Sequence, residues 1–118
     1  MPRSDSLGQF EQLVLAALVT LGENAYGVTI HQKVHELASS KAVTLGAIYV
    51  ALDRLEDKGF VSSWLSEPTA ARGGRAKRCY RLEVAGERAL RESIATAQRM
   101  ASTVRSIWGD LDKELGEA

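Results

Sequence analysis

Apolar side chains recur through residues 90–115 at alternating intervals of four and three residues. A period near 3.5 is typical of a helix that packs lengthwise against another helix. A helix over residues 84–115 would be about 45 Å long, too long to be covered by the small domain before it. We therefore predict a partner, most simply the same helix of a second chain; the alternative is packing along its own domain. The stripe consists of Leu90, Ile94, Ala97, Ala101, Val104, Trp108, Leu111 and Leu115.

A shorter helix is predicted near the N-terminus, over residues 10–21. One of its faces repeats apolar residues at intervals of three and four, and Gly22 ends it. Leu15 and Val19 make the opposite side apolar as well. Since a helix that is apolar on two sides is buried on two sides, we expect Leu15 and Val19 to join the interface with a partner.

The middle of the chain predicts two helices followed by a β-hairpin. Thr44 is a good N-cap for the second of these helices, and Gly59 closes it. The hairpin has short aromatic strands and a long tip containing Pro68 and two glycines. The expected helices cover residues 27–38 and 44–58, and the strands cover 60–65 and 78–82.

This order of elements defines the expected fold class, which is mainly α with a small β-hairpin. Two helices with a short turn between them form a helix-turn-helix, and the hairpin after them is a wing. We expect a winged helix-turn-helix DNA-binding domain over residues 1–83. Residues 84–118 would form the long C-terminal dimerisation helix.

The outward face of the predicted helix 44–58 is suited to a DNA groove. Leu45, Ile48, Leu52 and Leu55 form its expected buried stripe, whereas the opposite side carries mostly small residues. A helix with a small outer face can enter the major groove closely, and its start can contact a phosphate. The alternative is an ordinary amphipathic helix. The DNA-contacting residues expected here are Thr44, Gly46, Ala47, Val50 and Arg54, with Ala51 on the same outward side.

Charge is concentrated in the hairpin. The chain has 15 basic and 15 acidic residues, but residues 72–81 hold five basic residues and no acidic one. A local basic block can contact nucleic acid within a neutral chain, because salt screens charges beyond about 10 Å. Arg72, Gly74 and Arg75 are expected at the minor groove and Lys77 at a phosphate; the alternative is a solvated turn.

Other functions find little support in the sequence. It contains no nucleotide-binding or catalytic motif, so no enzyme is expected. His31 and His35 lack a third ligand, and we expect no metal or cofactor. Cys79 is expected to serve packing, with a redox role as the alternative. The single cysteine and the absence of a signal peptide or long apolar run predict a cytoplasmic protein without a membrane partner.

Two segments carry a family resemblance. TLGAIYVALDRLEDKGFV (44–61) and GGRAKRCYRLEVAGERAL (73–90) resemble the PadR family of bacterial transcriptional regulators, and the likeness extends from residue 13 to the last helix. It implies a winged helix-turn-helix homodimer that binds an inverted-repeat operator in double-stranded DNA, usually as a repressor. Glu83 departs from the family pattern, which commonly has threonine there, at the N-cap of the last helix.

The resemblance also implies roles for single residues. Tyr49 would reach a phosphate through its hydroxyl while its ring packs, Tyr26 and Gly27 would border the DNA backbone, and Arg75 would be the basic residue of the wing tip. Trp108 is large among small neighbours, so Val104 and Trp108 are expected to line a pocket for a small, planar aromatic effector. The alternative function is a protein-interaction module of the same fold that does not bind DNA.

Overall fold

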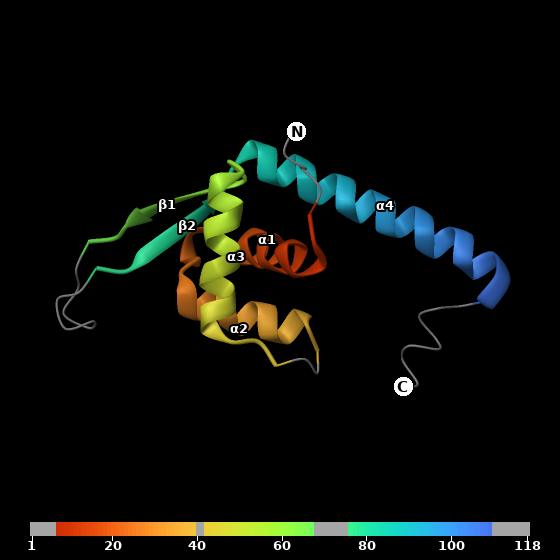
Figure 1. The fold of residues 1–118 in the computed structure, drawn as a ribbon, viewed down its shortest axis with the longest axis horizontal. Coiled ribbons are helices and arrows are strands. Elements are labelled where there is room, and N and C mark those ends of the chain that lie inside the picture. The colour runs from red at the N-terminus through yellow and green to blue at the C-terminus, as the bar shows by residue number, and fades with distance from the viewer. Residues whose placement is uncertain (1–6, 40–41, 68–75, 110–118) are drawn as a thin grey trace.

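The computed structural model describes residues 7–39, 42–67 and 76–109, which form helices around one core and a two-stranded hairpin (Figure 1). The element order confirms the expected fold class, mainly α with a small hairpin followed by a long C-terminal helix. The elements are α1 (Gln9–Leu21), a 3-10 turn η1 (Gly22–Asn24), α2 (Gly27–Leu37), α3 (Leu45–Asp57), β1 (Val61–Leu65), β2 (Arg78–Leu82) and α4 (Val84–Trp108).

The core lies where α1 packs against α2, α3 and the start of α4. The first three helices each contribute fully buried aliphatic side chains, such as Val14, Ile30 and Leu52. At the far end of α3, the Lys58 ammonium lies 3.1 Å from both carboxylate oxygens of Glu11, which joins α3 to the start of α1. This arrangement fixes α3 with one face on the core and the other in solvent.

The ends of α3 follow their sequence signals. The Thr44 hydroxyl oxygen accepts a hydrogen bond from the Ala47 backbone N–H at 3.1 Å, as expected of an N-cap. Gly59 follows the helix with a φ of 80°, in the left-handed region that glycine adopts without strain. The chain then turns directly into β1.

The hairpin has a neighbour that the sequence did not predict. β1 and β2 pair antiparallel, with Ser63 opposite Tyr80. The other edge of β2 pairs with the residues just before α2, where the Tyr80 backbone N–H donates to the Ala25 carbonyl at 2.9 Å. This pairing links the base of the wing to the start of α2.

The last helix is shorter than predicted. α4 ends at Trp108, and Gly109 follows with a φ of 84°, so the expected helix to residue 115 is wrong. Leu111 and Leu115 lie outside the described residues. The start of α4, at Glu83, has no side-chain cap, in keeping with the missing threonine. None of the described helices is long and apolar enough to span a membrane.

Four burial predictions need correction. Leu15 is 0% exposed and Leu90 is 7% exposed on the single chain, so both belong to its own core and neither is left to contact a partner. Ala51, expected to face outward, is buried, and Leu45, expected to be buried, is partly exposed. Ala51 is buried because α1 packs against the flank of α3 that carries it.

Candidate nucleic-acid interface

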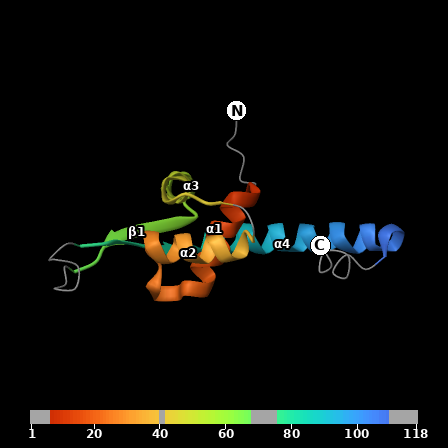
Figure 2. The same cartoon turned by 90° about the horizontal axis from the view of Figure 1, so that it is seen from below.

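The outer side of the first half of α3 is exposed to solvent. Figure 2 shows this helix almost end-on, standing clear of the layer formed by the hairpin and α4. Thr44, Gly46, Ala47 and Val50 are all exposed here, and Val50 is 53% exposed although it is apolar. We call these four residues the reading face.

The second half of α3 has a different character. Asp53, Glu56 and Asp57 are exposed there, and their carboxylates would repel phosphates. Glu56 accepts a hydrogen bond from the Ser63 hydroxyl at 2.8 Å. The surface of α3 open to a polyanion is therefore limited to its first half and to the flank that carries Arg54.

Tyr49 flanks the reading face on the side of α2. Its side chain is 41% exposed, and a methyl group on Gly27 would overlap its hydroxyl and ring. The phenol therefore lies directly over the first residue of α2, and Gly27 is buried beneath it. A helix start carries partial positive charge, so the Tyr49 hydroxyl and the first N–H groups of α2 face the same space.

Lys77 reaches the same end of α2 from the wing. Its ammonium lies 3.9 Å from the ring centroid of Tyr26, the residue that precedes α2. The negative face of an aromatic ring attracts a cation placed over it. Lys77 and Tyr49 thus give one flank of the reading face positive potential and hydrogen-bond donors.

A chain of hydrogen bonds that the sequence did not predict ties the wing to α3. Arg78 Nη1 donates to the Ser63 hydroxyl at 3.0 Å, and Ser63 donates onward to Glu56. Strand register, which the sequence alone did not give, brings these three residues together. The tip residues predicted to contact DNA, Arg72, Gly74 and Arg75, lie outside the described residues.

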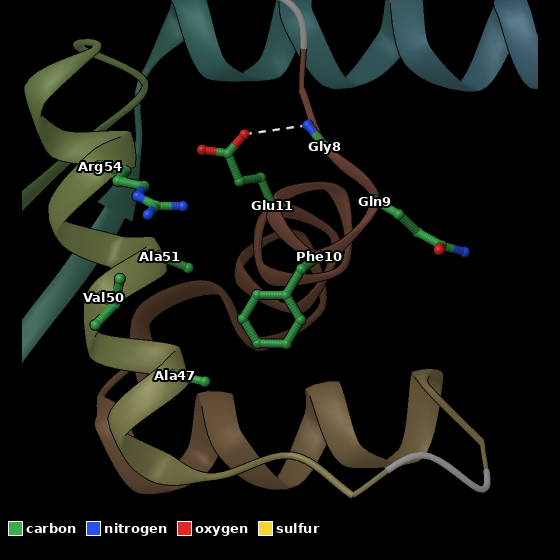
Figure 3. Close-up of a pocket in the computed structure, with 8 residues that line it drawn as sticks. All are labelled: Gly8, Gln9, Phe10, Glu11, Ala47, Val50, Ala51 and Arg54. Atoms are coloured by element: carbon green, nitrogen blue, oxygen red, sulfur yellow. Dashed lines mark hydrogen bonds between the residues drawn. The ribbon is translucent and has the colours of Figure 1, made fainter.

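Arg54 lies on the opposite flank, beside a hollow of about 460 Å³ between α3 and the start of α1 (Figure 3). Arg54 and Glu11 point toward this hollow. The Glu11 carboxylate already accepts hydrogen bonds from Lys58 and from the Gly8 backbone N–H. Ala47, Val50 and Ala51 form the wall on the α3 side, so the hollow opens beside the reading face.

A buried tyrosine lies behind α3. Burial raises the pKa of the Tyr80 phenol; Arg78 opposes this shift, and Asp53 and Glu56 reinforce it. A phenol is already neutral near physiological pH, and the raised pKa extends that range to higher pH. Tyr80 therefore adds no negative charge beneath the surface that faces outward.

A second surface runs along α4. Beyond Leu90 the helix leaves the core and extends away from the domain (Figure 1). Ile94 and Ala97 are exposed, Ala101 and Val104 are half-buried, and Trp108 is 64% exposed. Val19, on α1, is 59% exposed. Three exposed apolar residues of α4, Val84, Met100 and Ile107, lie outside the predicted stripe.

Comparisons with known proteins agree with this architecture. The model of the PadR-like transcriptional regulator family matches residues 14–92. A PadR family regulator from Clostridium difficile is 29% identical, with a TM-score of 0.66 over 86% of this chain and 98% of that one. A PadR-like transcription factor from Bacteroides fragilis is 28% identical, with a TM-score of 0.67 over 85% and 90%.

One further structure shares the fold. Bacillus subtilis PadR, solved in complex with operator DNA, is 24% identical, with a TM-score of 0.60 over 71% of this chain and 46% of that one. The comparison with curated proteins gave no match.

Proposed function

Because this chain belongs to the PadR-like family of transcriptional regulators, we propose that it binds duplex DNA as a homodimer. In this proposal it represses transcription until a small ligand releases it. The observation that carries the proposal is the exposed reading face of α3, which is flanked by Tyr49 and Lys77 on one side and by Arg54 on the other. A fold relative was solved with operator DNA, which supports the same partner here.

The proposed complex places the first half of α3 in the major groove, which admits one helix. Tyr49, Lys77 and the start of α2 contact phosphates of one strand, and Arg54 contacts the backbone on the other flank. Arg72, Gly74 and Arg75 approach the adjacent minor groove, as the sequence predicts. Thr44 places the first N–H groups of α3 toward a phosphate.

The proposed dimer forms along α4. Its apolar residues beyond the core, together with Val19, supply a surface that one chain leaves uncovered. Two chains related by a two-fold axis would present two α3 helices about 34 Å apart, one turn of DNA. Such a dimer reads an inverted repeat. The membership of a regulator family gives no support to an enzymatic role.

Binding to random duplex DNA at two salt concentrations tests the proposal. We expect a mobility shift that weakens steeply as salt rises, because each neutralised phosphate releases a counterion. Gly27→Ala is expected to weaken DNA binding about 3- to 10-fold. The new methyl group displaces the Tyr49 side chain, which removes the proposed hydrogen bond from the Tyr49 hydroxyl to a phosphate. Circular dichroism would check that the fold is kept.

A double-mutant comparison isolates this cause. If Gly27→Ala acts through Tyr49, it should have no further effect on affinity in a Tyr49→Ala background. A full additional loss in that background would contradict the proposed role of Tyr49. No shift on any duplex at low salt would leave the alternative, a protein-interaction module that does not bind DNA.

The effector is proposed to bind beside Trp108 and Val104 at the dimer centre. The exposed indole of Trp108 offers a flat apolar surface on which an aromatic ring can stack. In a Trp64→Phe variant Trp108 is the only tryptophan left in the chain, so selective excitation of tryptophan reports on it alone. Titration with planar aromatic compounds is expected to quench its fluorescence saturably and to weaken DNA binding in parallel. Unchanged fluorescence and DNA affinity would contradict this site.

A further inference from the structure

The reading face contains few groups that can form hydrogen bonds with bases. Gly46, Ala47 and Val50 have no polar side-chain atom. The Thr44 hydroxyl oxygen accepts a hydrogen bond from the Ala47 backbone N–H at the start of the helix, away from its outward centre, and the Tyr49 hydroxyl lies over Gly27 on the flank. The outward centre of this half of α3 therefore presents carbon atoms.

The polar residues of α3 lie away from this centre. Asp53, Glu56 and Asp57 occupy the second half of the helix, where their charge keeps phosphates at a distance. Arg54 lies one turn beyond Val50, where it lines the hollow beside α1 (Figure 3), and in the proposed complex it contacts the DNA backbone. The side chains that enter a groove first are consequently Ala47 and Val50.

In the major groove, only thymine among the four bases carries an apolar group, the methyl on C5. We infer that this protein recognises its half-site through thymine C5-methyl groups packed against Val50 and Ala47. This inference rests on the proposed function and specifies which chemical group of the DNA bases the reading face recognises. Burial of one methyl group corresponds to about a four-fold gain in affinity, from about 0.8 kcal/mol per buried carbon.

The test uses duplexes selected from a random pool by the full-length protein. Selected half-sites are expected to share at least one thymine. Replacing that thymine by deoxyuridine removes only the methyl group and is expected to weaken binding about four-fold per position. At the same position, a 5-methylcytosine·guanine pair should bind about four-fold more tightly than a cytosine·guanine pair, because the methyl group is restored.

Variants assign the contact to α3. Val50→Ala should abolish the difference between thymine and deoxyuridine at one position per half-site. Val84→Ala, a matched change at an exposed valine on α4, should preserve it. Deoxyuridine placed outside the selected site should have no effect on either protein.

Two results would overturn the inference. Equal affinity for thymine and deoxyuridine would exclude methyl recognition, while salt-dependent binding to random duplex would still support the proposed function. Undiminished sensitivity to deoxyuridine in both Val50→Ala and Ala47→Gly would place the contact outside α3. Failure to bind any duplex would overturn the inference together with the proposed function.

Discussion

Gly86→Ala is expected to lower the free energy of unfolding by about 3 kcal/mol, near the upper end of the usual cost of overpacking. Gly86 lies in the first turn of α4 and is buried. An added methyl group would overlap the Phe60 backbone carbonyl and the Leu82 side chain. The same carbonyl accepts a hydrogen bond from the Glu83 backbone N–H at 2.9 Å, so α4 cannot move away without breaking that bond.

Gly46→Ala is the matched control for this prediction. Gly46 is also a helical glycine, but nothing lies within 4 Å of an added methyl group. This variant should be more stable than the wild type by up to about 1 kcal/mol, because alanine favours helix. Urea unfolding at one protein concentration would measure both variants. Equal stability of Gly86→Ala and wild type would contradict the close contact between α4 and Phe60.

Local signals explain why much of α3 could be predicted. The N-cap at Thr44 and the glycine after the helix are short-range features, and the structure shows both. The outward position of Ala47 and Val50 follows from the same helical periodicity. The position of Ala51 did not follow, because a small residue on the flank is buried only when a neighbouring helix approaches it.

Burial against the chain itself and burial against a partner look alike in a sequence. Leu15 and Leu90 are apolar residues at regular helical spacing. This spacing predicts that they are buried, but it does not specify whether they contact their own chain or a partner. The structure places both in the protomer core. Only the three-dimensional packing of α1 against α4 could separate them from Ile94 and Val19, which stay exposed.

The pairing of Ala25 with Tyr80 could not be predicted from the sequence either, because the two residues are far apart in the chain and the hydrogen bond joins backbone atoms. This pairing matters for function, since it holds the base of the wing beside the start of α2. The placement of Lys77 over Tyr26 depends on it. The predicted division of the chain at residue 83 remains a prediction, although Gly86 and Leu90 of α4 pack into the preceding domain.

The combined change Ile94→Glu and Val104→Glu is expected to convert the proposed dimer into a monomer. Glutamate favours helix, so α4 should persist, whereas two charges per chain in an apolar interface are strongly unfavourable. Leu90 and Gly86 are buried and still anchor α4 to its own core, so the domain should remain folded. Sedimentation equilibrium would report the change in mass, and circular dichroism the retained helix.

The effect on DNA binding should exceed the effect on any single contact. A dimer bound to an inverted repeat gains its second half-site at high effective concentration, which commonly multiplies affinity by about 10² to 10⁴. The glutamate variant should therefore lose at least about 100-fold in affinity for the full repeat, yet bind an isolated half-site as the wild-type domain does. Ser102→Glu with Ser106→Glu adds the same charge at exposed polar positions of α4 and should keep both the dimer and the affinity. If the Ile94 and Val104 variant stayed dimeric, the interface would lie elsewhere than along α4.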